Sequence, residues 1–227
     1  MRRPDPEHRP EQPPPAGTPA VALLRGRLHQ ACAVLAVPAA VRAARAASTP
    51  GARRAGSCYG AALVTVFSVS AAYHRGRWDP RTRRLLKQLD HAAIFGFAAA
   101  SYAPLSMALP PAERRLLMTT VCSGAAVGSA VKAVRLDAQG GAADVLYLLV
   151  GWAGLLVLPA LRRSLTGSQQ ALLLAGGVLY TAGACVLVRR WPDPVPAVFG
   201  YHEAGHLVMA GGTVLHYLLD LSVLAQS

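Results

Sequence analysis

Long apolar blocks alternate along this chain with short stretches rich in basic residues, proline and glycine. Each block has about 18 to 24 residues, which matches the roughly 20 that an α-helix needs to cross a hydrocarbon core of about 30 Å. The pattern therefore predicts seven membrane-spanning helices, at about residues 28–46, 57–75, 88–108, 115–134, 143–161, 168–188 and 199–222. The first block is the weakest, because Arg42 and Arg45 lie near its end.

Composition supports an all-α integral membrane protein, a seven-transmembrane helix bundle. Hydrophobic residues make up 53% of the chain and charged residues 15%, whereas soluble domains are roughly 45–50% apolar and about 25% charged. The net charge of +12 does not indicate a nucleic-acid partner, because the basic residues lie almost entirely between the apolar blocks. These basic loops instead predict membrane lipids as partners, contacted through their anionic headgroups.

The distribution of lysine and arginine predicts the orientation, since these residues are retained on the cytoplasmic side of a membrane. With the N-terminus inside, that side holds more than half of the 23 basic residues, chiefly in the N-terminal tail and between the second and third spans. We therefore predict a cytoplasmic N-terminus and a C-terminus outside. Residues 1–24 are predicted to form a disordered cytosolic tail rich in proline and arginine, and residues 25–227 the transmembrane domain.

Ionisable residues inside membrane spans are costly and therefore mark candidate functional sites. The predicted topology places His74, Asp90, His202 and His206 at one depth near the cytoplasmic face. His202 and His206 are four residues apart, so they share one helix face about 6 Å apart along the axis, as two imidazole ligands of one metal do. His74 completes a set of three histidines, and we predict that they bind Zn²⁺.

Three protein ligands and a water molecule are typical of catalytic rather than structural zinc. Asp90 is predicted to accept a proton from that water or to orient it. Ser70 lies one turn before His74 and can hydrogen-bond to Asp90, a ligand or a substrate.

The remaining polar residues of the spans are interpreted as structural. His29 and His91 are expected to make ordinary polar contacts between helices. His216 lies about 15 Å beyond His206 along the helix, too far for the same metal, and is expected to form an interhelical hydrogen bond. Glu203 points about 100° away from His202 and is expected to meet only the membrane interface or a basic loop side chain.

Several segments together resemble the hemolysin III proteins, the bacterial branch of the progestin and adipoQ receptor family. They are LRGRLH (24–29), SAAYH (70–74), LDHAAIF (89–95), ASYAP (100–104) and HEAGH (202–206). The resemblance implies a seven-helix protein of the bacterial plasma membrane with a cytosolic N-terminus. It also implies zinc held by His74, His202 and His206, with Asp90 against the zinc-bound water and Ser70 matching the serine of the same motif.

The resemblance and the motifs leave three functions open. The first is a zinc protein that acts on or senses membrane lipid. Because the wider superfamily includes alkaline ceramidases, zinc-dependent hydrolysis of lipid amides is implied, with Asp90 as base and Ser70 holding the substrate or the developing oxyanion.

The second function is an intramembrane metalloprotease, because HEAGH matches HExxH with Glu203 as the base. In that case Glu203→Gln should abolish proteolysis, whereas it should leave a site of histidines and Asp90 largely intact. The third is a non-enzymatic receptor, cytolysin or pore with a structural metal, of which the hemolysin name implies cytolysis or pore formation. The deep parts of the fourth to sixth spans are nearly all Ala, Leu, Val and Gly, so no aqueous path is evident. The sequence assigns no oligomeric state.

Overall fold

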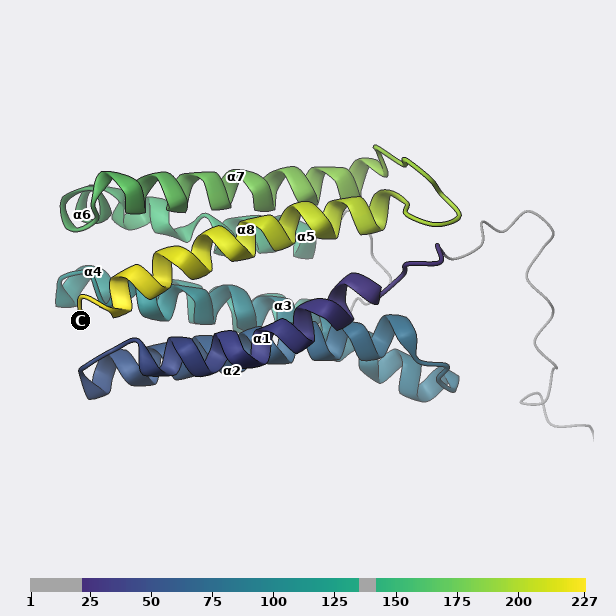
Figure 1. Ribbon diagram of the computed structural model, residues 1–227, viewed down its shortest axis with the longest axis horizontal. Helices are drawn as coiled ribbons and strands as arrows, with labels where there is room; N and C mark the ends of the chain where they lie inside the picture. Colours follow the sequence, from purple (N-terminus) through teal and green to yellow (C-terminus); the bar gives the residue numbers. More distant parts are fainter. Residues whose placement is uncertain (1–21, 135–141) are drawn as a thin grey trace, which may run out of the picture.

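The computed structural model of the protein describes residues 22–134 and 142–227. Within these ranges the chain is almost entirely helical, with no β-strand beyond one isolated bridge between Val195 and Phe199. The helices lie side by side along one long axis (Figure 1). The prediction of an all-α bundle is confirmed. The predicted disordered tail, residues 1–24, lies outside the described residues except for its last three.

Each predicted span has a helical counterpart. The helices are α1 (Arg27–Arg45), α2 (Pro50–Arg75), α3 (Pro80–Ser106), α4 (Pro111–Val134), α5 (Ala142–Gly151), the 3₁₀ helix η1 (Ala153–Val157), α6 (Leu158–Ser164), α7 (Gly167–Arg189) and α8 (Tyr201–Leu224). The fifth span corresponds to α5, η1 and α6 together.

Among the described residues, five stretches are long and apolar enough to cross a membrane: α2, α4, Val145–Ser164, α7 and α8. The other two predicted spans, α1 and α3, are long enough but less apolar. Helix α1 carries Arg42 and Arg45 in its last turn, and the first turns of α3 are strongly basic. Both helices nevertheless pack into the bundle, α1 mainly on α2, and α3 on α2 and α4.

Helices α2 and α3 begin earlier than their apolar blocks, at Pro50 and Pro80 rather than near residues 57 and 88. The side chains of Thr49 and Asp79 cap these helices by accepting hydrogen bonds from backbone N–H groups of the first turn. Proline follows each cap, where its missing N–H is not needed. The apolar blocks therefore indicated the part of each helix suited to lipid, while the helices extend beyond it.

The fifth span is broken, which corrects the prediction of one continuous helix over residues 143–161. Helix α5 ends at Gly151, and a 3₁₀ turn leads to α6, where Pro159 lacks the N–H that a continuous helix needs. The Tyr102 hydroxyl of α3 donates to the Gly151 carbonyl and accepts from the Gly154 N–H. A side chain from another helix thus satisfies the backbone groups that the break exposes, as a membrane interior requires.

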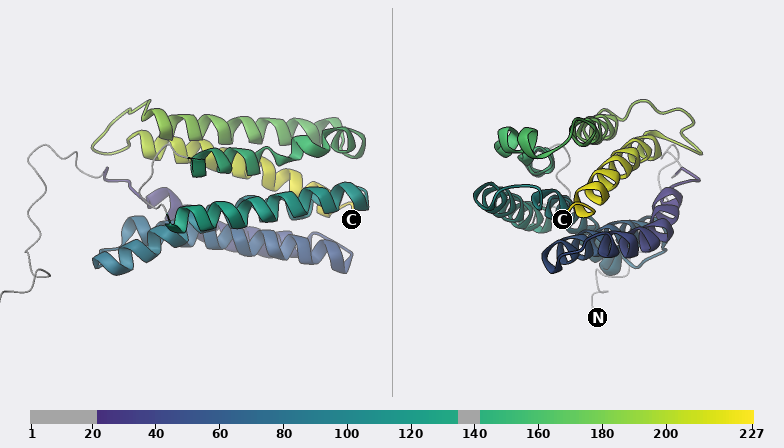
Figure 2. Two further views of the ribbon diagram at one scale, coloured as in Figure 1. Left: turned by 180° about the vertical axis from the view of Figure 1, so that it is seen from behind. Right: turned by 60° about the vertical axis from the view of Figure 1, so that its left-hand side comes forward.

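Helix α8 is the central element of the bundle. It contacts α7 most extensively and also touches α1, α2 and α3. The views in Figure 2 place it between the α1–α2 pair and α7. The start of α8 lies at the same end of the bundle as the start of α1 and the junction of α2 with α3, at the right of Figure 1. This end is where the candidate site is found.

Candidate functional site

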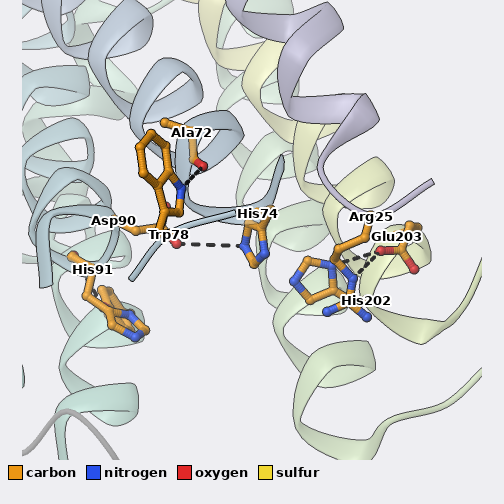
Figure 3. A network of polar contacts seen from close by, with 9 residues as sticks. Arg25, Ala72, His74, Trp78, Asp90, His91, His202 and Glu203 are labelled. Carbon is orange, nitrogen blue, oxygen red and sulfur yellow. Dashed lines mark hydrogen bonds and ion pairs between the residues drawn. The ribbon is translucent and has the colours of Figure 1, made fainter. Parts of the chain in front are cut away.

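Four of the residues selected from the sequence lie together at this end of the bundle. His74 occupies the last turn of α2, Asp90 lies on α3, and His202 and His206 occupy the first two turns of α8. The ring centroids of His74 and His202 are 4.9 Å apart, and those of His202 and His206 are 4.4 Å apart. The His74 Nε2 atom lies 3.8 Å from the Asp90 Oδ2 atom (Figure 3).

Asp90 is buried, and so is Ser70 one turn before His74. The Ser70 side chain lies within reach of the Asp90 carboxyl group, one of the three partners that the sequence left open for it. The second carboxyl oxygen, Oδ1, is also buried but has no hydrogen-bond partner within the described part of the chain. A buried carboxylate with one unpartnered oxygen is costly, and such groups are typical of functional sites.

His29 joins the same site, although the sequence interpretation treated it as an ordinary contact. Its ring centroid lies 4.4 Å from that of His206, 5.7 Å from that of His74 and 6.5 Å from that of His202. Its side chain comes from the first turn of α1 and is buried. We call these four residues the histidine cluster. A signal was present in the sequence, because the start of the first span is predicted at the same membrane depth as the other three histidines.

The turn before α1 brings His29 to the cluster. Gly26 has a φ of 76°, in the left-handed region that favours glycine, and caps the helix. A Cβ atom at Gly26 would lie 2.9 Å from the Cβ atom of His74. The N–H groups of Leu23 and Leu24 donate to the carbonyls of Ala197 and Val198, which ties this segment to the loop before α8.

Glu203 is bound into the site by three contacts. Its Oε1 atom accepts from Arg25 Nε at 2.7 Å and lies 3.2 Å from His202 Nδ1, while Oε2 accepts from the Gly200 N–H at 3.1 Å. A carboxylate only accepts hydrogen bonds, so Nδ1 of His202 carries the proton in this contact and Nε2 is the ring nitrogen left to accept another partner. The predicted basic partner is thus Arg25, but the expectation that Glu203 meets nothing else is wrong.

His91 and His216, the other two histidines in the described ranges, make the interhelical contacts that the sequence predicted. The Tyr147 hydroxyl lies 3.2 Å from His91 Nδ1. His216 Nε2 lies 3.1 Å from the Leu173 carbonyl oxygen. Neither ring belongs to the histidine cluster.

Whether the cluster can bind a metal depends on the distances between the imidazole rings and on the directions in which their nitrogen atoms point. Two imidazoles on one tetrahedral zinc, with Zn–N bonds of about 2.0–2.1 Å, have ring centroids roughly 5 Å apart. The neighbouring rings here are separated by 4.4 to 5.7 Å. However, among the described residues no group of three or more His, Cys, Asp or Glu side chains forms a ready-made ligand set. The residue types and the centroid spacing are those of a zinc site, but the side chains of the described residues are not arranged as a ligand set.

These features define a class of protein, a helical membrane bundle with a buried histidine cluster at one end. A family model described as Haemolysin-III related matches residues 22–217, most of the chain. The chain belongs to this family and is a multi-pass membrane protein. The resemblance that the motifs indicated is confirmed.

Two relatives illustrate the similarity. Hemolysin-3 of Bacillus cereus is 28% identical over 197 residues, covering 85% of this chain and 87% of the relative. A Hemolysin-3 homolog of Bacillus subtilis (strain 168) is 26% identical over 166 residues, covering 72% of this chain and 74% of the relative.

Proposed function

We propose that this protein binds zinc through His74, His202 and His206 and acts on or senses membrane lipid. The observation that carries the proposal is the convergence of these three imidazoles with the buried Asp90 at one end of the bundle. Neutral imidazole is a common zinc ligand, and the donor set contains no residue type that zinc disfavours. When bound, the metal would supply a Lewis acid and a nucleophile at neutral pH.

The protein groups around the histidines have distinct tasks in this proposal. Glu203 orients the His202 ring through Nδ1. The Asp90 carboxylate is the proton acceptor beside the cluster, and its Oδ2 atom lies 3.8 Å from His74 Nε2. Ser70 holds the Asp90 carboxyl group or a substrate oxygen. The reaction best suited to these groups is hydrolysis of a lipid amide, in which Asp90 takes a proton and Ser70 steadies the polar end of the substrate.

The location supports lipid as the substrate or ligand. The cluster residues lie in the end turns of α1, α2 and α8, where the polar head of a lipid lies at a membrane surface. The basic start of α3 is close by and suits anionic headgroups. The proposed membrane is the bacterial plasma membrane, with the cluster on its cytoplasmic side.

The contacts of Glu203 argue against the metalloprotease. A protease base must reach the water at the metal, yet both Glu203 oxygens are engaged by Arg25, His202 and Gly200. A cytolytic function is the second candidate, and the names of the two relatives favour it. Dye release from vesicles that contain the zinc-loaded protein, without lipid hydrolysis, would support cytolysis instead.

Metal analysis tests the ligand set. We expect the purified wild-type protein to hold about one zinc per chain, and a His202→Ala, His206→Ala double variant to hold little, because it loses two imidazoles. The His216→Ala variant is the control, since the His216 ring nitrogen lies 3.1 Å from the Leu173 carbonyl oxygen of α7 and the ring is not part of the cluster. Equal zinc in the wild type and the double variant would overturn the proposal.

Hydrolysis of a long-chain N-acyl lipid tests the role of Asp90. We expect Asp90→Asn to retain zinc but to lose about 100-fold or more in turnover, because an amide cannot serve as the base. The measurement is product release in detergent micelles, with zinc content determined on the same samples. Unchanged turnover in the zinc-loaded variant would exclude Asp90 as the base.

A further inference from the structure

The last turn of α1 carries two arginines, Arg42 and Arg45, at the end of the helix opposite to His29. About 24 Å of helix separates Arg45 from His29, so the two arginines lie far from the histidine cluster. Both side chains are exposed, and within the described part of the chain neither makes a hydrogen bond or an ion pair. Cationic side chains within a membrane-spanning segment are costly and mark a candidate functional site.

The two arginines line an open groove of about 700 Å³ between α1 and α8. The remaining lining is apolar and comes from both helices: Pro38, Val41, Ala46, Leu221 and Ala225. No carboxylate is among these lining residues. Since α1 runs from the cluster end of the bundle to the opposite end, Pro38 and Val41 lie deeper in the bundle than Arg45. The groove therefore has an apolar inner part and a basic mouth.

Packing elsewhere on α1 and α8 fixes the two walls of this groove. A Cβ atom at Gly60 of α2 would lie 2.8 Å from the Cα atom of Ala40, so this face of α1 rests closely on α2. Arg42 follows Ala40 by two positions, about 200° around the helix, and is thereby directed away from α2. The Tyr217 hydroxyl of α8 donates to the Ala39 carbonyl of α1 at 3.1 Å. The groove is thus bounded by helices that are fastened together.

We propose that this groove binds one anionic glycerophospholipid from the leaflet at this end of the bundle. Its phosphate would lie on Arg42 and Arg45, and one acyl chain would lie along the apolar lining. The planar guanidinium group matches phosphate oxygens with paired hydrogen bonds. The absence of a carboxylate in the lining leaves this positive charge for a ligand. A free phosphate would occupy only the mouth, whereas a lipid also covers Pro38, Val41 and Leu221. The site is separate from the proposed zinc site and does not depend on it.

Native mass spectrometry of the full-length protein, released from detergent micelles that contain phosphatidylglycerol, tests this site. We expect the wild type to retain one phosphatidylglycerol molecule per chain. An Arg42→Gln, Arg45→Gln double variant should bind it at least about 10-fold more weakly, because it loses charge-assisted hydrogen bonds to the phosphate. The control is Arg162→Gln, Arg163→Gln, which removes the same charge from the last turn of α6 at the same end of the bundle. This control should retain the lipid as the wild type does.

Three outcomes would overturn the proposal. Equal loss of lipid in the two double variants would indicate general attraction to basic residues rather than a site. Equal retention of phosphatidylcholine by the wild type would remove the preference for an anionic lipid, and displacement of the lipid by equimolar glycerol 3-phosphate would show that the apolar lining is not used. A lipid-free dimer that the Arg42 and Arg45 substitutions dissociate would assign the groove to a second copy of the chain. The comparison of ligands on the wild type decides the question even if the variants do not fold.

Discussion

Replacing Glu203 by glutamine is expected to weaken zinc binding about 10- to 100-fold, the usual cost of losing a partner that orients a metal ligand. In the structure the carboxylate accepts from His202, Arg25 and the Gly200 N–H at once. A glutamine has one oxygen and a donating NH₂ group, so it cannot satisfy all three donors. The His202 ring then loses its fixed orientation, and Arg25 loses its counter-charge.

Competition with a chromophoric zinc chelator in detergent measures the change. The matched control is Glu113→Gln, the same substitution in the first turn of α4. An unchanged affinity in Glu203→Gln would show that the carboxylate does not orient His202. This expectation differs from the one drawn from the sequence, in which Glu203→Gln leaves the histidine site largely intact.

The positions of the helices could be predicted because a membrane imposes them. Within the described residues, each of the seven apolar blocks corresponds to a helical stretch, since only a helix satisfies its own backbone in lipid over that length. The ends of the helices, in contrast, are determined by capping side chains and by contacts between helices. Caps at Thr49 and Asp79 start α2 and α3 in polar sequence, and the break after Gly151 depends on Tyr102, which is far away in the sequence.

The candidate site was predictable as far as membrane depth determines it. From membrane depth alone, His74, Asp90 and the α8 histidines could be predicted to lie at one end of the bundle. It could not show the rotation of α1 about its axis, and that rotation decides whether His29 faces the cluster. Glu203 was misjudged for a related reason. Side chains at neighbouring helix positions point in different directions, but the Glu203 side chain is long enough to reach both Arg25 and His202.

Replacing Gly60 by alanine is expected to destabilise the protein by about 1–3 kcal/mol, the usual cost of overpacking. A Cβ atom at Gly60 would lie 2.8 Å from the Cα atom of Ala40 on α1. One turn earlier, a Cβ at Gly56 would meet the Ala43 carbonyl. The obstacle in both cases is backbone, so α1 must move away from α2.

Gly96→Ala is the matched control, because a Cβ at Gly96 in α3 meets nothing within 4 Å. The two substitutions gain the same helix propensity, about 1 kcal/mol, so any difference between them reports packing. We expect thermal unfolding in detergent to occur at lower temperature for Gly60→Ala and at an equal or higher temperature for Gly96→Ala. Equal unfolding temperatures for both variants would contradict the close approach of α1 to α2.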